Sequence, residues 1–220
     1  MQVERDDVAR AWVSALASRG AQAPPAEGSV GSGAGMSCFG FKGGIGTSSR
    51  VTPEGHIVGV LLLTNFGERD RLTVDGVPVG RLLGPPPPQS AQTPVTKPAG
   101  SCIGLVVTDA PIDAAGCARL ARRVGLGLAR TGSVAHHGSG EIFMAFGTGL
   151  RMDSDGRYEG RAAVTGRALD PLFEAVVEAS EEAVLNSMLM SPTMTGRSGN
   201  TSEGLDPDAV QRLLREHGRL

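Results

Sequence analysis

The chain has 220 residues, of which 40% are hydrophobic, and its formal net charge is −2. This length suits one large domain or two small ones, and the lack of a basic surplus argues against nucleic acid or an anionic membrane as a partner. Aromatic residues make up only 4% of the chain, so it also lacks the rings on which single-stranded bases stack.

The three cysteines are Cys38, Cys102 and Cys117, scattered without a C-x-x-C pair. Such a set argues against a disulfide framework or a zinc site and favours a reducing compartment. No apolar stretch approaches the roughly 20 residues of a membrane span, and the charged start MQVERDDVARAW does not resemble a signal peptide. We predict a cytoplasmic protein without cofactor or metal; a signal peptide stays an open alternative if Met1 is an internal start.

Helices and strands alternate along the predicted chain, with apolar residues at helical spacing in some segments and short apolar runs in others. The predicted helices span residues 3–18, 113–131, 168–190 and 207–217. The predicted strands span 57–64, 102–107 and 142–147, with one or two short strands over 71–83. The run 57–64 is apolar on both faces, which predicts a central strand. This order predicts a mixed α/β fold with helices on both sides of the sheet.

A proline-rich loop from Gly84 to Gly100 leads to Ser101 and the apolar run 102–107. Its prolines cannot donate to a β-ladder and hold the backbone extended and exposed. Gly100 has no Cβ, so the Gly100–Ser101 peptide can adopt a strained conformation that leaves room for attack by the serine hydroxyl. We interpret Gly100–Ser101 as a candidate self-cleavage site. The alternative is an ordinary serine at the start of a strand.

Cleavage before Ser101 would create an N-terminal nucleophile. Attack by Oγ gives an N-to-O acyl shift, and water then releases the upstream piece. The freed α-amine of a protein has an ordinary pKa of roughly 7.7–8.0. A useful fraction is therefore neutral at cellular pH and can act as the base for the hydroxyl.

The stretch GSVAHHGSGE, residues 132–141, holds a second candidate group. Ser139 and Glu141 are two residues apart, so both point to one face of an extended segment and could relay a proton. The alternative is a loop with a solvated glutamate. His136 and His137 point in opposite directions in such a segment and have no third ligand at a suitable spacing, so we interpret one or both as structural.

Asn65 directly follows the run IVGVLLLT, and a carboxamide at the end of a rigid strand can donate to an oxyanion. A preorganised donor of this kind lowers the barrier by roughly 3–4 kcal/mol. The alternative is a turn residue in the sequence TNFG. Cys102 competes with Ser101 because a thiol is the better intrinsic nucleophile, but strand alternation turns it to the other face.

The glycine-rich stretch 28–47 contains no G-K-[ST] sequence, and no strand leads into it. These absences argue against a phosphate or dinucleotide site. We interpret the stretch, which includes Lys42, as backbone packed close to the core or to a substrate.

Several long segments together resemble one family, the DmpA-type L-aminopeptidases/D-esterase-amidases, which includes the β-peptidyl aminopeptidases. The resemblance runs from about Ala26 to about Ser202. The segments that support it are EGSVGSGAGMSCFGFKGGIGTSSRV, LLLTNFG, GS before LVVTDAP, LARRVGLGLARTGS, HHGSGE, FEAVVEASEEAVLNSM and TMTGRSGNT.

The resemblance implies an αββα sandwich like that of N-terminal-nucleophile hydrolases, with autocleavage at Gly100–Ser101. It implies a single domain over 1–220 that divides into subunit portions 1–100 and 101–220 and assembles into homo-oligomers of processed heterodimers. By the family pattern, Ser101 is the nucleophile, Ser139 and Glu141 assist it, and Asn65 binds the oxyanion. The expected substrates are small peptides, amides or esters.

The family also has an N-terminal portion before the segment that matches 3–18, and this portion supplies strands and an active-site tyrosine. These residues have no counterpart in the chain, and the one tyrosine, Tyr158, lies far downstream. Met1 is then an internal start, a frameshift remnant or the start of one part of a split gene. The alternative to an active aminopeptidase is therefore an impaired fragment, or one half of an enzyme that is inactive alone. An acyltransferase of the ornithine acetyltransferase type fits less well because that group uses threonine.

Overall fold

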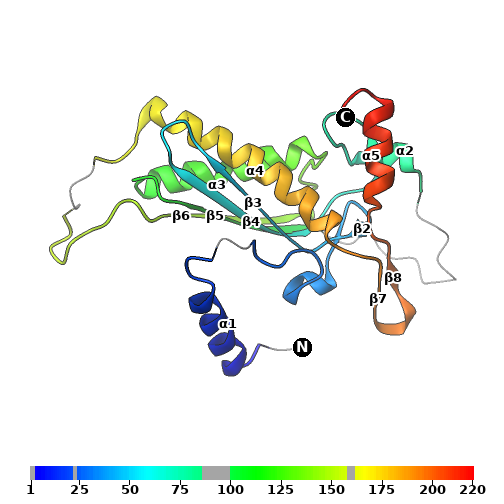
Figure 1. Ribbon diagram of the computed structural model, residues 1–220, viewed down its shortest axis with the longest axis horizontal. Helices are drawn as coiled ribbons and strands as arrows, with labels where there is room; N and C mark the ends of the chain where they lie inside the picture. The colour runs from blue at the N-terminus through cyan, green and yellow to red at the C-terminus, as the bar shows by residue number, and fades with distance from the viewer. Residues whose placement is uncertain (1–2, 22–23, 86–99, 158–161) are drawn as a thin grey trace.

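The computed structural model describes residues 3–21, 24–85, 100–157 and 162–220 (Figure 1). Its helices are α1 (Arg5–Ala17), α2 (Val79–Leu83), α3 (Ala114–Arg130), α4 (Asp170–Leu189) and α5 (Pro207–Glu216). Its strands are β1 (Ser37–Cys38), β2 (Phe41–Lys42), β3 (Ile45–Val51), β4 (Ile57–Asn65), β5 (Ser101–Thr108), β6 (Gly140–Gly147), β7 (Met194–Thr195) and β8 (Thr201–Ser202). The mixed α/β order predicted from the sequence is confirmed.

A four-stranded sheet with the order β3-β4-β5-β6 forms the centre of the molecule. β4 pairs antiparallel with both β3 and β5, and β5 pairs parallel with β6. A parallel pair needs a crossover connection, and α3 lies in the chain between β5 and β6. The central position predicted for the run 57–64 is confirmed.

Helices α3 and α4 lie side by side on one face of this sheet (Figure 1). α3 begins after Asp113, whose carboxylate caps the helix by accepting a hydrogen bond of 2.7 Å from the Gly116 amide. Alternate residues of β4 and β5 are buried beneath the helices. The core thus lies between the sheet and the two helices.

Close contact between α4 and β3 depends on Gly46. A Cβ at this position would lie 1.8 Å from the carbonyl oxygen of Ala183 in α4. No side chain fits there unless the helix moves away from the strand. The interpretation of the glycine-rich stretch as closely packed backbone is therefore confirmed at this contact.

The opposite face of the sheet presents apolar side chains to the surface. Ile142 and Met144 in β6 are 59% and 49% exposed, and Ile103 and Val107 in β5 are 42% and 45% exposed. Among the described residues, the helices that pack on the sheet cover one of its faces. An apolar surface of this kind is typical of a face that packs against another layer.

The prediction of strands over 71–83 is wrong for the second half of that segment. Val74 and Val77 form a single antiparallel bridge around the turn at Asp75–Gly76, and helix α2 follows at once. Pro78 has no N–H with which to extend the bridge into a ladder. The proline-rich loop at 86–99 and Tyr158 lie outside the described residues. In the ranges described, no helix is both long and apolar enough to cross a membrane.

Candidate active site

Ser101 and Asn65 are cross-strand partners at one end of the central sheet. Ser101 opens β5 and pairs with Asn65, the last residue of β4. On its other side Ser101 pairs with Gly140, the first residue of β6. Partners in a ladder direct their side chains to the same face, so the hydroxyl and the carboxamide start from neighbouring points. The sequence predicted both residues but not their pairing.

The peptide before Ser101 is held by hydrogen bonding and by close packing. The Gly140 amide donates a hydrogen bond of 3.0 Å to the carbonyl oxygen of Gly100. A Cβ at Gly100 would lie 3.2 Å from the Cα of Phe66, which is tight for a side chain. A backbone N–H in this position polarises the carbonyl that Ser101 would attack and can stabilise the negative charge that forms on its oxygen.

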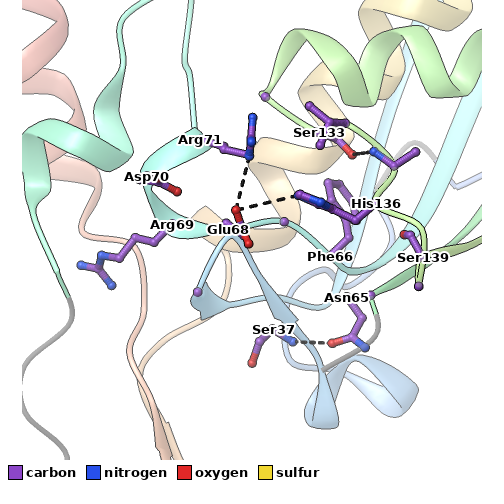
Figure 2. Close-up of a pocket in the computed structure, with 17 residues that line it drawn as sticks. Ser37, Asn65, Phe66, Glu68, Arg69, Asp70, Arg71, Ser133, His136 and Ser139 are labelled. Carbon is purple, nitrogen blue, oxygen red and sulfur yellow. Dashed lines mark hydrogen bonds and ion pairs between the residues drawn. The ribbon is translucent and has the colours of Figure 1, made fainter. Parts of the chain in front are cut away.

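The Asn65 carboxamide is oriented by a backbone group. Its Oδ1 accepts a hydrogen bond of 3.2 Å from the Ser37 amide (Figure 2). This contact directs Nδ2, which carries both amide hydrogens, away from Ser37. Among the described residues Nδ2 makes no hydrogen bond, so both of its hydrogens are available to a substrate oxygen.

Ser139 and Glu141 form the predicted pair, since the Ser139 hydroxyl donates a hydrogen bond to Oε1 of Glu141. Glu141 pairs with Cys102 in the ladder, one position beyond Ser101. Its side chain therefore starts from the face opposite to that of Ser101. Among the described residues, no hydrogen bond joins the Ser101 hydroxyl to either member of the pair. The pair is thus formed beside the start of β5 without direct contact with the hydroxyl.

Cys102 is packed in the core between the sheet and the helices that cover it. It is 1% exposed, and burial raises the pKa of its thiol above the ordinary value, with smaller contributions from Cys38 and Glu141. A buried thiol that stays protonated is a poor nucleophile. The structure therefore favours Ser101 over Cys102, in agreement with the alternation argument.

A cavity of about 810 Å³ opens beside the residue that precedes Ser101, although Ser101 and Glu141 are not among its lining residues. Asn65, Gly100 and Ser139 contribute to its wall. The remaining wall comes from the segments 66–71 and 132–136 together with Ser37, Gly40 and Gly138. Figure 2 shows Asn65 and Ser139 on one side of this cavity and the charged residues of segment 66–71 on the other. The volume suits a small ligand.

Glu68, Arg71 and His136 form a charged cluster in the cavity wall that the sequence analysis missed. The Glu68 carboxylate lies 3.4 Å from Nε of Arg71 and 3.8 Å from Nε2 of His136 (Figure 2). His136 therefore lines the cavity, and of the two histidines, one or both of which we interpret as structural, only His137 lies outside the cavity wall. Only the tertiary structure reveals this cluster, because 64 residues of chain separate Arg71 from His136 and the local pattern around Glu68 is that of a solvated loop.

Arg69 joins this wall to two distant segments. Its guanidinium lies 3.9 Å from the ring centre of Phe41, pairs with Glu203 at 2.9 Å and donates a hydrogen bond of 2.8 Å to the carbonyl of Gly84. The residue is only 13% exposed. Arg69 therefore anchors Gly84, the residue that follows α2.

The described residues contain no group of three or more histidine, cysteine or acidic side chains arranged to hold a metal ion. The chemistry that this site can perform with its own groups is nucleophilic attack, proton transfer and oxyanion stabilisation.

Comparisons of the sequence and of the structure with known proteins both find aminopeptidases. β-Peptidyl aminopeptidase BapA of Sphingosinicella microcystinivorans is 38% identical over 214 residues, which cover 91% of this chain and 54% of the relative. Among solved structures, a Burkholderia β-aminopeptidase matches with a TM-score of 0.74 and 38% identity, covering 89% of this chain and 55% of the other. The L-aminopeptidase D-Ala-esterase/amidase of Ochrobactrum anthropi, described as a new variant of the Ntn hydrolase fold, matches with a TM-score of 0.77 and 35% identity, covering 91% and 55%.

The chain therefore has the Ntn-hydrolase-like fold expected from the sequence, and it spans about half the length of the curated relatives it matches. The family model for peptidase family S58 matches residues 1–202, so the similarity extends through α1, upstream of Ala26. With its fold and its sequence in agreement, this chain belongs to peptidase family S58.

Proposed function

We propose that the protein is an aminopeptidase or amidase that cleaves itself before Ser101 and then uses that residue as its nucleophile. The observation that supports this most strongly is the arrangement at the start of β5. There, Ser101 follows a glycine whose carbonyl accepts a backbone hydrogen bond, and it pairs with an asparagine whose Nδ2 faces no partner among the described residues.

Self-cleavage would proceed through an ester. Oγ of Ser101 attacks the carbonyl carbon of Gly100, and its proton passes to the departing nitrogen as the C–N bond breaks. Water then hydrolyses the ester, which leaves a carboxylate on Gly100 and a free α-amine on Ser101. The Gly140 amide, 3.0 Å from the Gly100 oxygen, would stabilise the negative charge that forms there. The products are residues 1–100 and 101–220.

The same serine would then act on substrates. The α-amine of Ser101 takes the proton from Oγ, which attacks the carbonyl of a small amide or ester. Nδ2 of Asn65 donates to the oxyanion. The Ser139–Glu141 pair, at the start of the neighbouring strand, holds the α-amine and passes protons to the leaving group. Water hydrolyses the acyl-enzyme and releases the second product.

The substrate class follows from the relatives and from the size of the cavity. Two of the relatives are named β-peptidyl or β-aminopeptidases, and a third is an L-aminopeptidase that also acts on D-Ala esters and amides. A cavity of about 810 Å³ admits one or two amino-acid residues. We propose small peptides, amides or esters with a free amino terminus as substrates, cleaved by a homo-oligomer of processed heterodimers in the cytoplasm.

The test is release of nitroaniline from a panel of α- and β-aminoacyl p-nitroanilides by the purified protein. We expect release of at least one member, at a rate that falls to background in Ser101→Ala. Turnover by Ser101→Ala equal to that of the parent would contradict the nucleophile. If the protein cleaves itself but hydrolyses none of the p-nitroanilides, the proposal that this chain acts alone would be contradicted.

The open apolar face of the sheet favours a second candidate, in which the chain is one half of an enzyme. Apolar side chains such as Ile142, which is 59% exposed, would then be covered by a complementary polypeptide. In that case the isolated protein cleaves itself but hydrolyses no substrate. Turnover by the isolated protein would rule this candidate out.

A further inference from the structure

Lys42 is a buried cation outside the candidate catalytic set. The residue is 2% exposed, and its ammonium group donates hydrogen bonds to three carbonyl oxygens, those of Gly33 (2.9 Å), Met36 (2.7 Å) and Gly43 (2.7 Å). All three belong to the glycine-rich stretch. Burial lowers the pKa of Lys42 from its ordinary value. A charge held this way is costly unless its hydrogen bonds are satisfied, and here three are made.

One of these contacts leads directly to Asn65. The carbonyl of Met36 and the amide of Ser37 belong to the same peptide group. Lys42 holds the oxygen of that group at 2.7 Å, together with the Gly43 amide, which donates to it at 3.1 Å, and the N–H of the same group donates to Oδ1 of Asn65 at 3.2 Å. A cation on the oxygen fixes the plane of the peptide and, through polarisation, strengthens its N–H as a donor.

From this chain of contacts we infer that Lys42 is a positioning residue for the reaction, acting on Asn65 through the Met36–Ser37 peptide. Its ammonium group holds the peptide in the orientation that presents the Ser37 N–H to Asn65, and this fixes the direction of Nδ2. The catalytic part of the inference rests on the proposed function. Its structural part, that Lys42 determines the hydrogen bond between Ser37 and Asn65, does not.

If Lys42 only stabilised the glycine-rich stretch, loss of another buried side chain that holds this stretch should have the same effect on the Ser37 amide and on kcat. Ser191 supplies the comparison, because its hydroxyl donates a hydrogen bond of 3.0 Å to Gly43 O, one of the three oxygens that Lys42 also holds. Ser191 is buried, and among the described residues the hydrogen bonds of its hydroxyl go to Ser29, Gly43 and Ser187 and none goes to the Met36–Ser37 peptide. Ser191→Ala therefore removes one hydrogen bond to Gly43 O and leaves in place the hydrogen bond from Lys42 to Met36 O.

The experiment compares Lys42→Met, Lys42→Gln and Ser191→Ala with the parent protein. Hydrogen exchange of the Ser37 amide, followed by NMR, reports the contact with Asn65 whether or not the protein is active. We expect exchange to be about tenfold faster in Lys42→Met, and to change less than about twofold in Ser191→Ala, with the amides of β4 unchanged in all variants. Lys42→Gln retains a hydrogen-bond donor, so it should speed exchange of the Ser37 amide less than Lys42→Met does.

Kinetics on an aminoacyl p-nitroanilide give the second readout. Lys42→Met should lower kcat about 10- to 100-fold with little change in KM, because misdirecting the oxyanion donor costs part of what removing it costs. In an Asn65→Ala background the same change should alter kcat less than about twofold, since both substitutions act on one contact.

The outcomes test the positioning role of Lys42 separately from the proposed hydrolase activity. Unchanged exchange at Ser37 in a folded Lys42→Met protein would overturn the inference, as would additive losses in the double variant. Failure of both Lys42 variants to fold would assign the residue to the core and also overturn it. A parent protein without turnover would contradict the proposed function, and the exchange measurement would still decide whether Lys42 holds the contact.

Discussion

Asn65 and Ser101 face each other as the last pair of the ladder between β4 and β5. This pairing fixes the proposed oxyanion donor relative to the proposed nucleophile through backbone hydrogen bonds rather than through a loop. A shift of the register by one residue would turn Ser101 to the helix-covered face and bring Cys102 to the open one. The packing of buried β4 and β5 residues beneath α3 and α4 therefore also determines the geometry of the site.

Substituting Asn65 tests the oxyanion donor separately from its orientation. Asn65→Asp retains an oxygen that can accept from Ser37, but it has no hydrogens to donate and adds a negative charge. We expect both Asn65→Asp and Asn65→Ala to lower kcat about 100- to 1,000-fold with KM little changed. Steady-state kinetics check this, and a kcat for Asn65→Asp close to that of the parent would contradict the role of Nδ2.

The pair formed by Ser139 and Glu141 is expected to assist proton transfer. Ser139→Ala removes the donor of their hydrogen bond and should slow turnover about 100-fold, the lower end of what general acid–base groups contribute. The chain offers a matched control in Ser48 of β3, at the edge of the sheet opposite to β6, whose hydroxyl donates a hydrogen bond of 2.7 Å to Glu182 in α4. Ser48→Ala should retain the activity of the parent. Equal losses in the two variants would show that Ser139 has no special role.

Gly46→Ala should destabilise the fold. The added methyl group would lie 1.8 Å from the Ala183 carbonyl oxygen, so α4 must move away from β3. We expect a loss of about 1–3 kcal/mol in the free energy of unfolding, as for other overpacked cores. Gly59→Ala is the control, because its Cβ would lie 3.9 Å from Val107 O. That change should fall within about 0.5 kcal/mol of the parent, as measured by denaturant unfolding.

The buried thiols predict a loss of stability at alkaline pH. Burial raises the pKa of Cys38 from 9.0 to about 12, and burial also raises that of Cys102. In the unfolded chain these thiols ionise above pH 9, whereas in the folded protein Cys38 stays protonated until about pH 12. The stabilisation from the neutral thiol is therefore complete below pH 9 and is lost as the pH rises toward 12.

Comparison with Cys38→Ala isolates this effect. Between pH 9 and 11 the parent should lose up to about 1.4 kcal/mol more per pH unit than the variant, the value for one proton. Parallel pH profiles for the two proteins would contradict the burial argument.

Cys117, which is only partly buried, should react first with a thiol reagent in the folded protein.

Most of the central sheet and the residues at its end could be predicted because their signals are local. Apolar runs define β4 and β5, and a spacing of two predicts that Ser139 and Glu141 share a face. The cluster of Glu68, Arg71 and His136 could not be predicted, because tertiary folding brings together loops whose local composition is that of solvated turns. Likewise, Lys42 is buried among carbonyls by the folding of its own loop, and no periodic pattern indicates this.

The helix α2 was missed for a related reason. Its five residues, Val79–Leu83, are too few to show a helical period. The apolar runs alone predicted helices on both sides of the sheet, whereas among the described residues helices cover one face. The apolar residues of β4, such as Ile57 and Leu61, indicate burial on both sides and do not show which face stays open.

The central claim, that Ser101 is freed by self-cleavage, is tested most directly by intact mass spectrometry of the purified protein during incubation, with sequencing of the new N-terminus. We predict that the parent mass gives way to two fragments, 1–100 and 101–220, that the second begins with Ser101, and that Ser101→Ala stays intact. A parent protein that keeps its full mass after long incubation, or a Ser101→Ala protein cleaved at the same bond, would contradict the account.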